Sequence, residues 1–216
     1  GTWSQLKKKH GFDSFFHLAA VINDTILIEK NSNGINVADY KPYDSEEIQK
    51  VIFQKTLTLQ NISFDIKTTG EGSIRQLSIQ PKGLEIDNQN MTLKIDGQVV
   101  NAEIEDLNSD GSPEILIYTR SLGSGSYGNV IGYSVNNGKS ISQIYFPELS
   151  DNKEANIGYM GHDEFAIIET SLARRFPIYK NGDTNNNPTG GMRQIQYKLK
   201  DGEASRLFVI DKISKY

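Results

Sequence analysis

The sequence predicts an all-β protein: an antiparallel β-sandwich, with a barrel as the second choice, and a partly helical N-terminal extension. Isoleucine outnumbers leucine by 25 to 15 and there are ten tyrosines, a bias that favours strands over helices. Short alternating apolar segments recur about every ten residues with turn residues between them, as in sandwiches and barrels. The 216 residues contain no cysteine, so the packing of a core has to hold the fold together.

The first fifty residues lack this strand pattern. A short basic segment covers residues 7–10, and the pattern of residues 13–21 predicts one helix. A second helix start is expected at residues 44–47, where an Asp-Ser pair precedes two glutamates. We therefore divide the chain into an N-terminal extension, residues 1–53, and an antiparallel β domain, residues 54–216.

Alternation identifies the strands that follow. Leu57 and Leu59 share one face of a first strand. Phe64 and Ile66 continue the alternation after a change of phase near Asn61, where we expect a bulge or a bend.

Three dipeptides predict hairpins, because Asp-Gly and Asn-Gly favour the tight turns that join antiparallel strands. The first, at residues 96–97, separates the alternating segments 91–95 and 99–104. The others lie at residues 137–138 and 201–202, and the last would join the segment ending at Leu199 to the one containing Phe208.

Composition excludes several functions. A net charge of −4 and a pI near 5.5 argue against binding to a nucleic-acid backbone. Without cysteine there is neither a thiol nucleophile nor a cysteine-ligated metal. No segment approaches the ~20 apolar residues of a membrane span, and the apolar segment 18–22 is too short for a signal-peptide core. The expected targeting segment is therefore not within the sequence.

A polar segment between two predicted strands has two interpretations. Oxygen-bearing side chains stand at alternate positions, with glycine in the sixth place, as in loops that bind calcium: Asp106, Asn108, Asp110 and Glu114. The twelfth position, which is a glutamate in a complete loop of this type, is Ile117. The other interpretation is a polar turn whose side chains bond their own backbone, and both stay open.

A glycine-rich segment, residues 123–128, follows the apolar strand 115–118. It matches G-x-G-x-x-G, but alternating residues follow it, whereas a dinucleotide site needs a helix there. What remains is a flexible loop in which Ser124 and Tyr127 can donate and accept hydrogen bonds. Alternatively, Tyr127 packs onto the sheet. Further on, His162-Asp163-Glu164 predicts a solvated turn.

Two of these segments resemble the bacterial periplasmic inhibitors of invertebrate-type lysozyme. Such proteins carry D-L-(D/N)-x-D-x-x-P-E, an apolar strand and then R-S-x-G-S-G-x-Y, which correspond here to residues 106–114 and 120–127. The resemblance implies a β-sandwich exported to the periplasm, whose serine–glycine–tyrosine loop enters the sugar cleft of the enzyme. It implies that Ser124 and Tyr127 bond the catalytic carboxylates, that Gly125 permits close approach, and that Arg120 and Ser121 shape the base of the loop.

We therefore expect a protein-binding module that is not an enzyme, with a lysozyme-type glycoside hydrolase as its partner and no cofactor. The alternative is an extracytoplasmic β module, stabilised by calcium, that binds a glycan or an envelope partner. A homodimer stays open. Lysozymes are generally basic, so the charge of −4 would favour encounter. A hydrolase with two converging acids has no motif in its favour.

Overall fold

The computed structural model describes residues 19–22, 25–28 and 50–216, and it divides the chain into two units, residues 1–49 and 50–216. In the first unit, strands β1 (Ala19–Ile22) and β2 (Thr25–Ile28) form an antiparallel pair. The helix predicted over residues 13–21 is therefore wrong in its last residues, where Val21 and the following Ile22 favour a strand. Its earlier part and the helix start at residues 44–47 lie outside the described residues.

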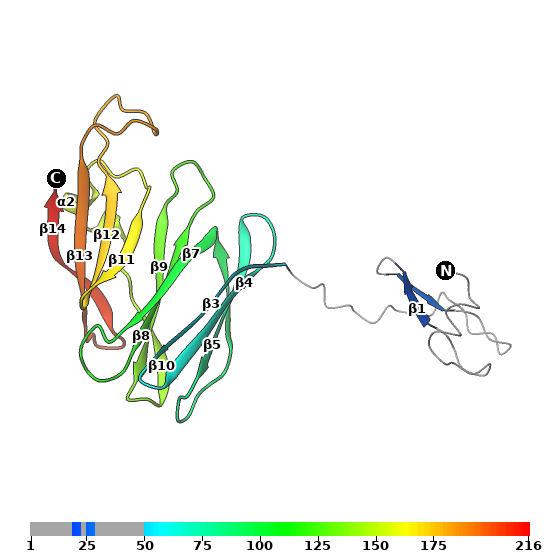
Figure 1. The fold of residues 1–216 in the computed structure, drawn as a ribbon. Coiled ribbons are helices and arrows are strands. Elements are labelled where there is room, and N and C mark those ends of the chain that lie inside the picture. Colours follow the sequence, from blue (N-terminus) through cyan, green and yellow to red (C-terminus); the bar gives the residue numbers. More distant parts are fainter. Residues whose placement is uncertain (1–18, 23–24, 29–49) are drawn as a thin grey trace, which may run out of the picture. The chain divides into compact units, whose positions relative to one another are not determined.

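The second unit consists of three antiparallel sheets, each made from four consecutive strands (Figure 1). The first sheet contains β3 (Val51–Leu59), β4 (Ile62–Thr69), β5 (Ile74–Lys82) and β6 (Met91–Asp96). The second contains β7 (Gln98–Glu105), β8 (Glu114–Arg120), β9 (Gly128–Asn136) and β10 (Ser140–Ile144). The third contains β11 (Glu164–Ile168), β12 (Ser171–Pro177), β13 (Met192–Lys200) and β14 (Leu207–Lys215).

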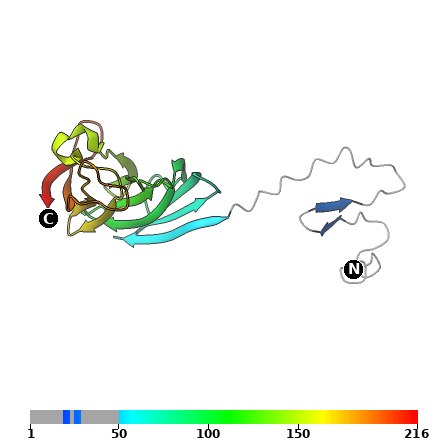
Figure 2. The ribbon, with the colours of Figure 1, turned by 90° about the horizontal axis from the view of Figure 1, so that it is seen from above.

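The second sheet lies between the other two, as the alternation of β8 shows. Ile115 and Ile117 pack into a core with residues of the first sheet such as Phe64. Leu116 and Tyr118, on the opposite face, pack into a separate core with residues of the third sheet. Figure 2 shows the first and third sheets on opposite sides of this unit. The predicted antiparallel sandwich is confirmed, with three layers, and these sheets do not close into a barrel.

Two of the three predicted hairpins form. At Asn137-Gly138, both residues have positive φ, 51° and 70°, and the turn joins β9 to β10. The Asp201-Gly202 segment joins β13 to β14 through a longer connection. Near Asn61, instead of a bulge, a two-residue turn at Gln60-Asn61 ends one strand and begins the next.

The hairpin predicted at Asp96-Gly97 is wrong. β6 pairs with β5 and β7 pairs with β8, so the dipeptide is a corner at which the chain passes from the first sheet to the second. Gly97 has φ of 107°, and a Cβ there would lie 2.1 Å from the carbonyl oxygen of Arg120. Gly97 does turn the chain at this point, but packing between sheets decides which strands the two flanking segments pair with.

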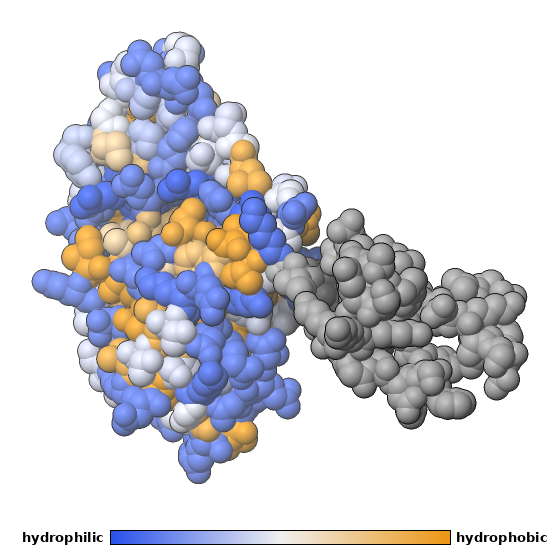
Figure 3. Space-filling view, turned by 45° about the vertical axis from the view of Figure 1, so that its right-hand side comes forward, coloured by the Kyte–Doolittle hydropathy of each residue, from blue (hydrophilic) through white to orange (hydrophobic). Residues whose placement is uncertain are grey.

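A 3₁₀ turn, η2 (Leu149–Asp151), and a short helix, α2 (Lys153–Asn156), connect the second sheet to the third. Figure 3 shows hydrophobic residues in a band across one face of this unit, with hydrophilic residues around them. Among the residues that the structure describes, no helix is long and apolar enough to cross a membrane.

The corner at Gly97 gives a test of the fold. We expect Gly97→Ala to lower the free energy of unfolding by about 3 kcal/mol or more, because the methyl group meets backbone that cannot move aside cheaply. The control is Gly138→Ala, at φ of 70° with nothing within 4 Å of the added carbon, where only about 1 kcal/mol of backbone strain is expected. Equal losses in urea unfolding would contradict the close contact at Gly97.

Candidate functional site

The loop between β8 and β9 projects from one end of the second sheet. At its base, Ser121 and Tyr127 are joined twice: the Tyr127 amide donates to Ser121 Oγ at 2.9 Å, and the Ser121 amide donates to the Tyr127 carbonyl at 2.9 Å. At its tip, the Ser126 amide donates to the Gly123 carbonyl at 3.0 Å. Ser121 thus closes a short, compact loop through its own side chain and its backbone.

The side chains of this loop are largely available to solvent. Ser124 is exposed and Tyr127 is 51% exposed. The Tyr127 ring contacts Tyr159 edge-on at 5.7 Å and lies against Gly125, where a Cβ would come within 2.4 Å of the ring. Within residues 50–216, the hydroxyls of Ser124 and Tyr127 have no hydrogen-bond partner. Tyr127 is therefore fixed by its ring while its hydroxyl is left free.

A buried carboxylate supports the loop where it enters β9. Asp163 Oδ2 accepts hydrogen bonds from the Gly128 amide at 2.8 Å and from the Tyr159 hydroxyl at 2.6 Å. Asp163 Oδ1 accepts from Arg174 Nε at 2.7 Å, and both side chains of this ion pair are almost fully buried. Burial, followed by the bond to Asp163, raises the pKa of Tyr159 far above its usual range. The solvated turn predicted around Asp163 is therefore wrong.

Arg174 is further held by aromatic rings. Its guanidinium lies 5.0 to 6.0 Å from four ring centroids, those of Phe146, Tyr159, Phe165 and Phe176. It also donates to the Tyr159 hydroxyl at 2.9 Å, while Arg120 Nη2 reaches the Asp163 carbonyl at 3.4 Å. Arg120, predicted to shape the base of the loop, is thus placed beside the ion pair that supports it.

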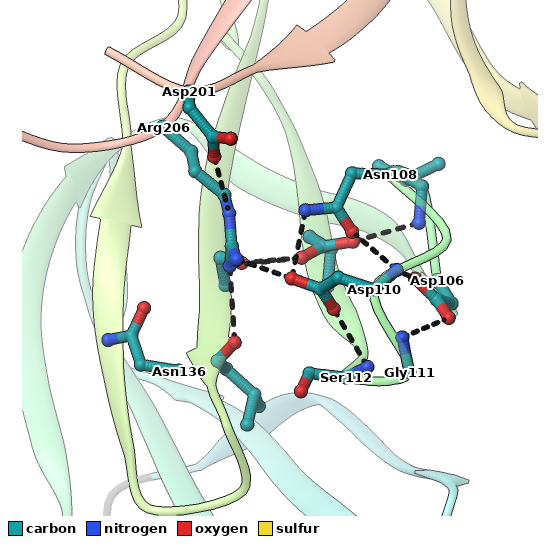
Figure 4. Close-up of polar contacts among 12 residues, drawn as sticks. Asp106, Asn108, Asp110, Gly111, Ser112, Asn136, Asp201 and Arg206 are labelled. Carbon is teal, nitrogen blue, oxygen red and sulfur yellow. Dashed lines mark hydrogen bonds and ion pairs between the residues drawn. The ribbon is translucent and has the colours of Figure 1, made fainter.

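The second candidate segment, residues 106–114, forms a tight turn that bonds its own backbone (Figure 4). The Asp106 carboxylate accepts from the amides of Asp110 and Gly111 at 3.0 and 2.9 Å. Asp110 Oδ1 accepts from the Ser112 amide at 2.8 Å, and the Asn108 amide group donates to Asp110 Oδ2 at 3.0 Å. This is the arrangement of the polar-turn interpretation.

An arginine that no sequence motif points to completes this turn. Arg206, from the segment between β13 and β14, pairs with the Asp110 carboxylate and lies 3.6 Å from Glu114 Oε1. Its guanidinium also donates to Ser134 Oγ and, at 3.1 Å, to the Val135 carbonyl. The positive charge beside the turn therefore comes from the connection between β13 and β14.

Glu114 is fully buried at the start of β8, and the Arg206 guanidinium lies between its carboxylate and that of Asp110. Its carboxylate accepts from the Leu107 amide at 2.8 Å and from the Ser134 hydroxyl. Among the described residues, no three His, Cys, Asp or Glu side chains are grouped so that they could hold a metal ion. Calcium at Asp106, Asn108, Asp110 and Glu114 stays a prediction.

The fold and the first loop define a class of protein: a β-sheet module that presents a short hydroxyl-rich loop from a rigid support. Residues 84–157, about a third of the chain, match the family described as periplasmic lysozyme inhibitor of I-type lysozyme. The match runs from before β6 to just after α2 and includes the whole second sheet and both candidate loops. The resemblance seen in the sequence is confirmed for this segment. No curated protein and no solved structure matches the chain.

The buried Glu114 predicts a pH dependence of stability. Burial raises the pKa of Glu114 to about 7, although bonds from Ser134 and Leu107 and the charge of Arg206 act to lower it. Between pH 4.5 and 7 the unfolded chain has lost a proton that the folded protein keeps, so rising pH favours unfolding. We expect the free energy of unfolding to fall by up to about 3 kcal/mol over this range through Glu114.

Urea unfolding at several pH values, on the wild type and on Glu114→Gln, measures this contribution. The variant keeps an acceptor for Leu107 but cannot titrate, so its stability should change less over the same range. Parallel pH profiles for the two proteins would show that Glu114 is not the responsible group.

Thermal melts with calcium and with a chelator test the metal prediction, because an ion that binds the native state raises the melting temperature. Since Arg206 already pairs with Asp110, we expect coincident curves for the wild type. A melting temperature that rises with calcium, and does not rise in Asp106→Asn, would instead establish a calcium site at the turn.

Proposed function

We propose that this protein binds an invertebrate-type lysozyme and blocks its sugar cleft with the loop of residues 120–127, in the periplasm or another extracytoplasmic space. One observation carries the proposal: the segment that matches the inhibitor family contains an exposed loop whose serine and tyrosine hydroxyls are unpaired within the described residues. These hydroxyls stand on a loop closed at its base and supported by a buried ion pair.

The chemistry of the loop suits a cleft built to hold sugars. Glycoside hydrolases act with two carboxyl groups, and a substrate brings hydroxyls to the polar groups around them. Ser124 and Tyr127 can supply hydroxyls in the same way, and each can donate to a carboxylate or accept from a protonated acid. Because the loop contains no glycosidic bond, the enzyme would hold it without a reaction.

The other loop residues have supporting roles in this proposal. Gly125 lacks a side chain, which lets the Tyr127 ring lie against it and lets the tip approach another surface closely. Ser121 and Arg120 hold the base. A net charge of −4 would increase the rate of encounter with a basic enzyme, and this effect would weaken with salt.

Inhibition assays against a panel of lysozymes that includes the invertebrate type test the proposal. Purified protein should inhibit that enzyme, and Ser124→Ala combined with Tyr127→Phe should weaken inhibition by about 100-fold or more, the loss expected for two hydrogen bonds to charged groups. Each change removes only a hydroxyl, so the loop should keep its shape.

Matched controls use residues of the same types outside the loop. Ser150→Ala, in η2, and Tyr145→Phe, after β10, alter exposed side chains and should leave inhibition unchanged. Full lysozyme activity at micromolar wild-type protein would reject the proposed function.

A further inference from the structure

The backbone of the candidate loop is held by residues from outside the segment that matches the inhibitor family. The Ser124 carbonyl accepts a hydrogen bond from Asn185 Nδ2 at 2.7 Å, and the Gly125 carbonyl accepts one from the His162 amide at 2.8 Å. The matched segment ends at residue 157, so both donors lie beyond it. The two residues at the centre of the loop are therefore positioned by parts of the chain associated with the third sheet.

Asn185 is itself fixed from two directions. Its Oδ1 lies 3.0 Å from His162 Nε2, and its carbonyl accepts from the Tyr179 hydroxyl at 2.9 Å. The rings of His162 and Tyr179 stack with centroids 6.3 Å apart. One asparagine side chain thus spans from the candidate loop to His162, while its backbone is anchored on Tyr179.

The loop that carries Asn185 connects β12 to β13 and lies at the same end of the unit as the β8–β9 loop (Figure 1). Asp183 closes it by accepting from the amides of Lys180 and Thr189 at 2.7 and 2.8 Å and from the Thr189 hydroxyl at 2.9 Å. A loop with this internal bonding can act as a support for another loop.

Direct backbone contact leaves little room between the two segments. Gly161 has φ of 90°, and a Cβ there would lie 2.0 Å from the Gly125 carbonyl oxygen. Glycine is thus required on both counts, by conformation and by space. The close approach aligns the next amide, that of His162, with the Gly125 carbonyl.

We propose that Asn185 and His162 form a bracket that holds the Ser124-Gly125 backbone in one conformation before any partner binds, with Asn185 as the positioning residue. What the loop binds rests on the proposed function; that the loop is held rests on these contacts alone. A preorganised loop loses less conformational freedom on binding, so the bracket should increase affinity without touching the partner. The connections of the third sheet would then contribute to binding by positioning the candidate loop.

The test variant is Asn185→Asp, which keeps an oxygen acceptor towards His162 but replaces the donor to the Ser124 carbonyl. The control is Asn186→Ala in the same loop, where the side chain is exposed. Two measurements are made on the full chain: ¹⁵N relaxation of residues 122–127 in the free protein, and the inhibition constant against an invertebrate-type lysozyme.

We expect the order parameters of residues 122–127 to fall in Asn185→Asp and to stay at wild-type values in Asn186→Ala. Inhibition should weaken about three- to tenfold, which corresponds to one hydrogen bond, with no matching loss in the control. A purely structural role would lower the melting temperature without mobilising the loop selectively, so thermal melts of both variants accompany these measurements.

The outcomes separate the two proposals. Unchanged order parameters in Asn185→Asp would overturn the bracket, and a mobile loop that inhibits as strongly as the wild type would overturn its contribution to affinity. If the wild type inhibits no lysozyme but the loop becomes mobile in Asn185→Asp, the bracket stands and the proposed function fails.

Discussion

The buried ion pair between Asp163 and Arg174 is the interaction on which the rest of this end of the protein depends. One carboxylate binds the first residue of β9, the hydroxyl of Tyr159 and the guanidinium of a β12 arginine. Removing two charges from water is costly, and here hydrogen bonds and aromatic rings around the guanidinium compensate for that loss. Loss of either partner would leave an unpaired charge in the core, and loss of Asp163 would also remove the acceptor for the Gly128 amide.

A second charged centre performs a similar task at the opposite end of β8. Arg206, just before β14, reaches across to Asp110 in the turn before β8 and to Glu114 at the start of β8. Each end of the interface between the second and third sheets therefore has one arginine that satisfies buried or partly buried carboxylates. Between them lies an apolar core of residues such as Leu116 and Phe208. The polar contacts give a unique alignment to two apolar faces that could otherwise pack in several ways.

The sequence was sufficient where structure is decided locally. Alternation located most strands, Asn137-Gly138 located a hairpin, and glycines and hydroxyls indicated a loop after the strand 115–118. It was insufficient where distant segments meet. Asp96-Gly97 has the same local chemistry as a hairpin, yet its flanking strands join different sheets. Asp163 and Arg206 lie in polar surroundings along the chain, so nothing local distinguishes them from solvated residues. Their burial depends on contacts with residues far away in the sequence, which a short stretch of sequence does not contain.

The two apolar faces of β8 have a consequence for how the protein is made. Because each sheet consists of consecutive strands, the first two can assemble while the third is still being synthesised. During that interval Leu116 and Tyr118 face solvent on a sheet with no cover. A chain cut off or delayed before β11 would therefore be prone to aggregation, and a chaperone acting on the nascent protein would find its binding surface there.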